Sequence, residues 1–184
     1  LGNPQPWALL TLHRAELADN YDALVATVTS IARACHERGV RIAWPVHPRI
    51  KVWIHNASTR GTEVAAELRA LGLECVNPVP YSTMAALLAS QDAGVRACSP
   101  VAVITDSGGL AEEAQQCGYP LLIVRPSTER IELLVQEEVP VYIVAPCADV
   151  DAMLPAVRNF VTDAISFMDA GALSAARGRD LTRS

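Results

Sequence analysis

The sequence predicts an α/β protein built on a doubly wound, mostly parallel, six-stranded Rossmann-like sheet. Short apolar segments rich in β-branched residues recur along the 184 residues and alternate with amphipathic segments long enough for helices. Polar residues and glycines follow the apolar segments at the points where they end. In a parallel sheet these ends meet at one edge, and open sheets of this class bind ligands there.

The expected elements follow this alternation in order. Strands are expected at residues 7–12, 40–44, 73–76, 101–104, 121–124 and 141–144. Helices are expected at residues 17–38, 62–71, 82–88, 110–117, 131–138 and 149–170, and Gly39, Gly72 and Gly118 are placed to end three of them. The strand order 3-2-1-4-5-6 would bring the first and fourth strands together, so that His13 and Ser107 face each other across the switch point.

Composition favours one domain over residues 1–184, with residues 1–6 as a linker remnant and residues 173–184 as a polar tail. The chain is 51% hydrophobic and 19% charged, which allows a substantial core. The net charge of −5 and the lack of a basic run argue against a nucleic-acid partner. No apolar stretch approaches the roughly 18 residues of a membrane span, and no signal peptide is visible, so we expect a cytoplasmic protein without a membrane partner.

Cysteine usage indicates neither a metal site nor a disulfide framework. The five cysteines are odd in number and widely spaced, and no Cys-x-x-Cys pair occurs among Cys35, Cys75, Cys98, Cys117 and Cys147. We therefore expect reduced thiols and no bound metal.

Residues 101–130 carry the strongest chemical signal. A β-branched strand runs into Thr-Asp-Ser, where Ser107 is a suitable N-cap, and Gly108 and Gly109 leave the backbone open to a ligand. Strand, glycine turn and helix N-terminus together form an anion site, because the first amides of the helix are unpaired and the macrodipole adds positive charge. The alternative is that the two glycines form only a tight strand-to-helix turn.

Two further groups complete this candidate site. Glu113 lies about 8 Å along the helix, a distance that suits sugar hydroxyl groups better than phosphate. Arg130 follows the next strand at the same edge and can offer a guanidinium fork to the same anion. The residues therefore predict a site for a phosphate or diphosphate, with a carboxylate placed for sugar hydroxyl groups.

This motif resembles the signature of the non-hydrolysing UDP-N-acetylglucosamine 2-epimerases. The resemblance rests on Thr105-Asp106-Ser107-Gly108-Gly109, Glu112-Glu113, Arg125 and Thr128-Glu129-Arg130. Enzymes of that family have two Rossmann-like domains in the GT-B arrangement, and the chain is similar to the C-terminal one over nearly its whole length. The resemblance implies that Ser107, Gly108, Gly109 and Arg130 hold the diphosphate and that Glu113 holds the ribose.

Two histidines match strand-end motifs of the same family in part. His13-Arg14 resembles the His-Arg motif near the substrate diphosphate, although Ala15 and Leu17 depart from the common form. His13 is thus the candidate catalytic residue and Arg14 a candidate binding residue; the alternative is a satisfied histidine at a strand end. His47 lies in a similar Pro-Val-His motif whose second half is lost, which makes it the weaker candidate.

A proline-tyrosine loop after the third strand offers a place for the base. In the family, the corresponding loop and the start of its helix hold the uracil, which implicates Tyr81 and Met84 here. The alternative for Tyr81 is a partly buried aromatic residue of the loop.

The resemblance implies an epimerase that eliminates UDP from UDP-N-acetylglucosamine and adds it back with inverted C2, without a cofactor. The family's proton-transferring carboxylates belong to the other domain, so we expect this chain alone to bind UDP weakly and turn nothing over. The expected partners are UDP or a UDP-sugar, an N-terminal domain or partner half, and a second copy in a homodimer. The alternatives are a domain of a GT-B glycosyltransferase or hydrolysing epimerase, and a non-catalytic partner subunit.

Overall fold

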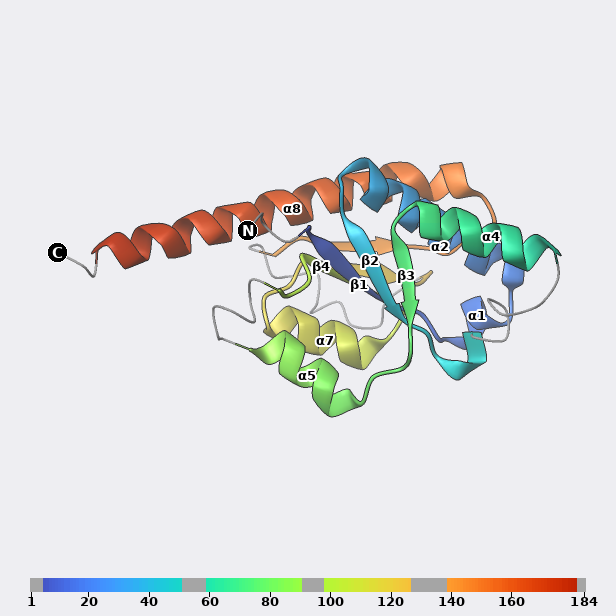
Figure 1. Cartoon of the computed structure of the whole chain (residues 1–184), viewed down its shortest axis with the longest axis horizontal. Helices are drawn as coiled ribbons and strands as arrows, with labels where there is room; N and C mark the ends of the chain where they lie inside the picture. Colours follow the sequence, from blue (N-terminus) through green and yellow to red (C-terminus); the bar gives the residue numbers. More distant parts are fainter. Residues whose placement is uncertain (1–4, 51–58, 91–97, 127–138, 182–184) are drawn as a thin grey trace.

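A six-stranded parallel sheet forms the centre of the computed structural model, which describes residues 5–50, 59–90, 98–126 and 139–181 (Figure 1). The strands are β1 (Trp7–Thr11), β2 (Arg41–Pro45), β3 (Leu73–Val76), β4 (Ala102–Thr105), β5 (Leu121–Val124) and β6 (Val141–Val144). Their order is β3-β2-β1-β4-β5-β6, which confirms the predicted order, and all five strand pairings are parallel.

Helices cover both faces of this sheet (Figure 1). They are α1 (Ala15–Ala18), α2 (Tyr21–Glu37), α4 (Thr59–Ala70), α5 (Tyr81–Ala89), α7 (Gly108–Gln116) and α8 (Val150–Leu181). Helices α2, α4 and α8 lie on one face, and α5 and α7 lie on the other. This is the two-sided arrangement of a doubly wound sheet.

Successive strand residues alternate between two apolar cores. Leu10, Ile104 and Leu122 face α2 and α8, where they pack with fully buried side chains such as Phe160. Leu9, Val103 and Leu121 face α5 and α7. Because both faces of β4 and β5 are buried, these strands read as continuous apolar runs rather than as alternating patterns.

Three predicted helix boundaries are wrong in instructive ways. The helix expected at 17–38 is divided into α1 and α2, because the side chain of Asn20 accepts the N–H of Ala23 and starts a new helix. Helix α5 begins at Tyr81, directly after Pro80, and not at residue 82 as expected. Helix α8 continues through the predicted tail to Leu181, and its end extends beyond the sheet in Figure 1.

Other local predictions are confirmed or fall outside the described part. Gly39, Gly72 and Gly118 have φ values of 69°, 85° and 77°, which only glycine adopts readily, and each follows a helix. The helix expected at 131–138 lies outside the described residues. None of the helices in the described ranges has the length and apolar character needed to cross a bilayer.

Candidate functional site

The junction between β4 and α7 leaves backbone donors open at the carboxyl edge of the sheet. Ser107 caps α7, as predicted, and its Oγ accepts the N–H of Leu110 at 3.5 Å. The N–H groups of Gly108 and Gly109 have no hydrogen-bond partner within the described ranges. A Cβ built on Gly109 would meet no atom within 4 Å, so the backbone there borders open space. This corner can accept an anion.

Asp106 joins this corner to the end of β1. Its side chain is almost completely buried, and Oδ2 accepts the main-chain N–H groups of His13 and Arg14 at 2.8 Å each. Charged acceptors make strong hydrogen bonds to backbone N–H groups, especially away from water. Asp106 therefore holds the His13-Arg14 segment against the start of α7.

Two threonines at the ends of the central strands reinforce the same corner. Thr11 and Thr105 are register partners in β1 and β4, and their hydroxyl oxygens lie 2.8 Å apart. Thr105 Oγ1 also accepts the N–H of Ser107 at 3.0 Å. These bonds set the backbone direction of Ser107, so the cap, and with it the open amides of α7, is positioned by the sheet.

His13 and His47 lie together at this edge. Their ring centroids are 5.6 Å apart, although the two residues follow different strands. His13 Nδ1 lies 3.4 Å from Asp106 Oδ1, and the His13 side chain is 41% exposed. His47 Nδ1 accepts the N–H of Arg49 at 3.2 Å. The structure thus brings together both histidines that the sequence singled out.

A cavity of about 190 Å³ lies beside Asp106 at the ends of β4, β5 and β6. Arg14, Glu16 and Arg125 are among the residues that line it. Its wall carries two guanidinium groups, of Arg14 and Arg125, and two carboxylates, of Glu16 and Asp106. Arg14 lines this cavity, its predicted contact with the ligand stays a prediction, and Arg125 is a further candidate.

Tyr81 and Glu113, predicted to contact base and ribose, contact each other. The Tyr81 hydroxyl donates to Glu113 Oε1 at 2.7 Å, although the tyrosine side chain is largely exposed. This hydrogen bond, together with the negative charge of Glu113, raises the pKa of Tyr81 above its usual value. The pair connects α5 to α7 and leaves the tyrosine ring open to stacking.

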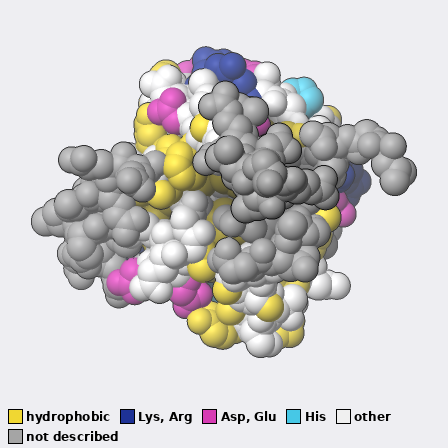
Figure 2. Space-filling view, turned by 90° about the vertical axis from the view of Figure 1, so that its left-hand side faces the viewer, with side chains coloured by type: hydrophobic (Ala, Val, Ile, Leu, Met, Phe, Trp, Pro, Cys, Tyr) yellow, Lys and Arg dark blue, Asp and Glu magenta, His cyan; other side chains and the backbone are white. Residues whose placement is uncertain are grey.

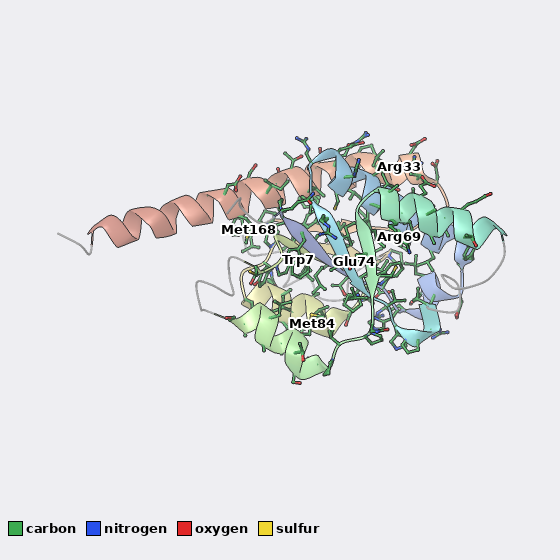
Figure 3. All side chains as sticks on the ribbon, viewed as in Figure 1. Trp7, Arg33, Arg69, Glu74, Met84 and Met168 are labelled. Atoms are coloured by element: carbon green, nitrogen blue, oxygen red, sulfur yellow. The ribbon has the colours of Figure 1, made fainter. Side chains whose placement is uncertain are left out.

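Met84 packs against the core, and its predicted contact with the uracil stays a prediction. It lies on α5 beside α7 (Figure 3), is half-buried and packs against the core of Leu9, Val103 and Leu121. Hydrophobic side chains also gather at the lower end of the molecule, where α5 lies (Figure 2). Arg130 lies outside the described residues, so its predicted contact with the diphosphate stays a prediction.

A larger cavity of about 940 Å³ lies elsewhere, along β3 and α4. Arg69 and Glu74, which are labelled in Figure 3, line it. None of the predicted site residues that the structure describes borders it. The volume of a cavity alone therefore does not identify the functional site. We assign the candidate site from the polar groups at the carboxyl ends of β1 and β4.

Sequence reasoning missed the functions of Asp106 and of the threonine pair. Asp106 was recognised only as part of a motif, although an acidic residue between a buried strand and a helix cap is an available signal. Its partners, the N–H groups of His13 and Arg14, lie more than ninety positions earlier in the chain. Only the pairing of β1 with β4 brings them into contact.

Comparison with known proteins identifies the family of the chain. The model of the UDP-N-acetylglucosamine 2-epimerase family matches residues 2–168. A UDP-N-acetylglucosamine 2-epimerase of Methanococcus maripaludis is 34% identical over 130 residues, which make up 71% of this chain and 32% of that protein. A UDP-2,3-diacetamido-2,3-dideoxy-D-glucuronate 2-epimerase of Pseudomonas aeruginosa is 34% identical over 137 residues, or 73% of this chain and 32% of that protein.

A solved structure shows the same arrangement. The UDP-GlcNAc 2-epimerase of Methanocaldococcus jannaschii in complex with UDP-GlcNAc and UDP superposes with a TM-score of 0.65 and 25% identity, covering 86% of this chain and 39% of that one. The chain spans about a third of the length of the curated relatives described above. From the family match and these likenesses, the chain belongs to the UDP-N-acetylglucosamine 2-epimerase family.

Proposed function

We propose that residues 1–184 form the UDP-sugar-binding domain of a cytoplasmic UDP-N-acetylglucosamine 2-epimerase. The observation that carries the proposal is the N-terminus of α7. There the Gly108 and Gly109 amides have no partner in the described part of the chain, a Cβ on Gly109 would meet no atom within 4 Å, and Arg14 and Arg125 line a cavity beside the preceding Asp106. A diphosphate suits these donors because backbone amides, guanidinium groups and a helix dipole all favour negative charge. A solved relative was crystallised with UDP-GlcNAc and UDP, which supports this ligand class.

The proposed roles follow from position. The amides of Gly108 and Gly109 bind the diphosphate, with His13, His47 and Arg14 around it, and Arg130 adds a further cation. Glu113 contacts the ribose, and Tyr81 and Met84 flank the uracil. When the ligand binds, the Tyr81–Glu113 hydrogen bond is available to be exchanged for one to a ribose hydroxyl group.

The proposed reaction is elimination of UDP from UDP-N-acetylglucosamine, followed by its re-addition with inverted C2 to give UDP-N-acetylmannosamine. Negative charge builds on the departing diphosphate as the C1–O bond breaks. Preorganised amides at the start of α7 stabilise that charge more in the transition state than in the bound substrate, which accelerates the step. The proton-transferring carboxylates are expected on an N-terminal domain, so that the chain by itself binds but does not turn over.

Binding selectivity tests this proposal. The chain is titrated with UDP, ADP and inorganic pyrophosphate by isothermal calorimetry, at concentrations high enough for millimolar affinity. The expected result is binding of UDP in preference to ADP, with pyrophosphate competing for the same site. Equal affinity for UDP and ADP would reject the role of Tyr81 and Met84, and no binding of either nucleotide would reject the site itself.

The full reaction needs a separate assay. The chain is incubated with UDP-N-acetylglucosamine alone and together with an N-terminal epimerase domain, and UDP-N-acetylmannosamine is measured by chromatography. Turnover is expected only in the second mixture. Turnover by the chain alone would show that the carboxylates needed for proton transfer lie within these 184 residues.

A further inference from the structure

We propose that Asp106 is a positioning residue that makes His13 take up a proton when the diphosphate of a nucleotide sugar binds. The inference rests on the proposed function, because it requires an anion at the start of α7. It adds a residue that the sequence did not assign, and a coupling between ligand binding and the protonation of one particular imidazole.

The first observation is an unused oxygen on a fixed carboxylate. Both main-chain hydrogen bonds to Asp106 reach Oδ2, so the carboxylate cannot rotate without losing them. Its other oxygen, Oδ1, is buried and accepts no hydrogen bond in the described part of the chain. That oxygen lies 3.4 Å from His13 Nδ1. A buried acceptor without a donor is unfavourable, so a proton on Nδ1 would satisfy it after a small movement of the ring.

The second observation distinguishes the two neighbouring imidazoles. His47 Nδ1 accepts the N–H of Arg49, which requires a lone pair on that nitrogen and therefore a neutral ring. His13 Nδ1 instead faces a carboxylate oxygen, which requires an N–H. The rings lie 5.6 Å apart, where two positive charges would repel each other. The geometry therefore suits an N–H at His13 Nδ1 and a lone pair at His47 Nδ1.

The third observation concerns the other charges around this pair. Arg14 and Arg125 line the cavity beside Asp106 and oppose a positive charge on His13, whereas Glu16 at the same wall favours it. Arg49 is paired with Asp19 at 2.8 Å. A bound diphosphate adds negative charge among these cations. It thereby removes the main obstacle to the imidazolium form of His13.

An imidazole donates from both nitrogens only when it is protonated. In the complex, His13 donates Nδ1–H to Asp106 and Nε2–H to a phosphate oxygen. One proton moves from solvent to His13 as the ligand binds, and no covalent bond of the ligand changes. The imidazolium is then in place when charge develops on the departing diphosphate.

The pH dependence of binding tests the coupling. The ligand is UDP-N-acetylglucosamine, whose diphosphate is esterified at both ends and does not itself titrate near neutrality. Its dissociation constant is measured by NMR titration between pH 6 and pH 9. Uptake of one proton predicts that the constant rises about tenfold per pH unit at the alkaline end of this range.

The decisive variant is Asp106→Asn. Its amide oxygen can still accept the two main-chain N–H groups, but its NH₂ group would donate to His13 Nδ1 and hold the ring neutral. The expected result is a dissociation constant that no longer varies with pH. His36→Gln is the matched control, because His36 is exposed on the last turn of α2 and should keep the full pH dependence. A purely structural Asp106 would lower the unfolding temperature of the variant and leave the pH dependence intact.

The outcomes separate the two proposals. If the chain does not bind UDP-N-acetylglucosamine at any pH, the proposed function fails and the coupling fails with it. Binding that does not vary with pH overturns the coupling alone. The coupling is also overturned if the dissociation constant of Asp106→Asn still varies with pH. It is likewise overturned if His47→Gln abolishes the pH dependence while His13→Gln retains it.

A direct measurement on the wild-type chain remains decisive even where the Asp106→Asn variant does not fold. The ring nitrogens of His13 are observed by ¹⁵N NMR with and without UDP-N-acetylglucosamine at pH 8, and His13→Gln assigns the signals. Two protonated ring nitrogens in the complex are expected. An unprotonated ring nitrogen on His13 in the complex would overturn the proposal.

Discussion

The hydroxyl group of Tyr81 donates a 2.7 Å hydrogen bond to Glu113 and so joins the first residue of α5 to the second turn of α7. Both residues were predicted to contact the nucleotide, one through the base and the other through the ribose. In the structure they contact each other across a surface where the tyrosine is 69% exposed. The absorbance of Tyr81 can therefore report on whether this hydrogen bond is formed.

Replacement of Glu113 should lower the pKa of Tyr81. The hydrogen bond and charge of Glu113 raise that pKa, so the contribution of the pair to stability is present below about pH 10, the pKa of an unfolded tyrosine, and is lost as pH rises through the raised value. Glu113→Gln removes the charge and should return the pKa toward about 10. Absorbance at 295 nm of the wild type minus Tyr81→Phe isolates this titration. A difference curve centred at the ordinary tyrosine value in the wild type would contradict the hydrogen bond.

Gly109→Ala should separate stability from binding. A Cβ at this position meets no atom within 4 Å, so the alanine fits and should stabilise the helix by about 0.5 kcal/mol. The added methyl group projects into the space proposed for the diphosphate and should weaken UDP binding severalfold. Gly171→Ala in α8 is the matched control, because its Cβ also meets open space but lies away from the site. Equal UDP affinity of both variants would exclude the diphosphate from this corner.

Asp106→Ala should destabilise the chain more than the loss of a helix cap. Truncation leaves the buried N–H groups of His13 and Arg14 without their acceptor, at a cost of about 2–4 kcal/mol. Asn20→Ala removes the cap of α2 and should cost about 1 kcal/mol. Urea unfolding of both variants gives the comparison. Equal losses of unfolding free energy would mean that Asp106 does not hold β1 to β4 in the way described.

The cysteines should differ in reactivity according to burial. Burial raises the pKa of Cys35 to about 12, so almost no nucleophilic thiolate forms there at neutral pH. Cys75 and Cys98 are exposed at the surface. Iodoacetamide at pH 8, followed by mass spectrometry, should label these two in the native chain and Cys35 only after unfolding. Labelling of native Cys35 at the rate of Cys98 would contradict the packing of α2.

The strand positions and the cap at Ser107 could be predicted from sequence because both depend on local patterns, and the strand order followed from the doubly wound fold class. β-branched runs mark the strands, and Ser-Gly-Gly after such a run marks a helix start. The sequence does not predict the break before α2, because the apolar stripe continues on both sides of Asp19-Asn20. Only the hydrogen bond that the Asn20 side chain accepts from Ala23 N–H shows that a new helix begins there.

Contacts within the site could not be predicted because their partners lie far apart in the chain. Tyr81 and Glu113 belong to separate sequence motifs, and their mutual hydrogen bond depends on how α5 packs beside α7. The function of Asp106 depends on main-chain groups of another strand, which carry no side-chain signature. The sequence predicted the residue types of the site, whereas tertiary packing determines which of them support one another.

The most direct test of a nucleotide site at the start of α7 is a map of backbone amide shifts. The chain, labelled with ¹⁵N, is titrated with UDP while two-dimensional NMR spectra are recorded. The largest shifts are expected at the amides of Gly108 and Gly109, followed by His13, as these groups become hydrogen-bonded to phosphate. Saturable shifts confined to another surface, such as the flank of β3, would contradict the account.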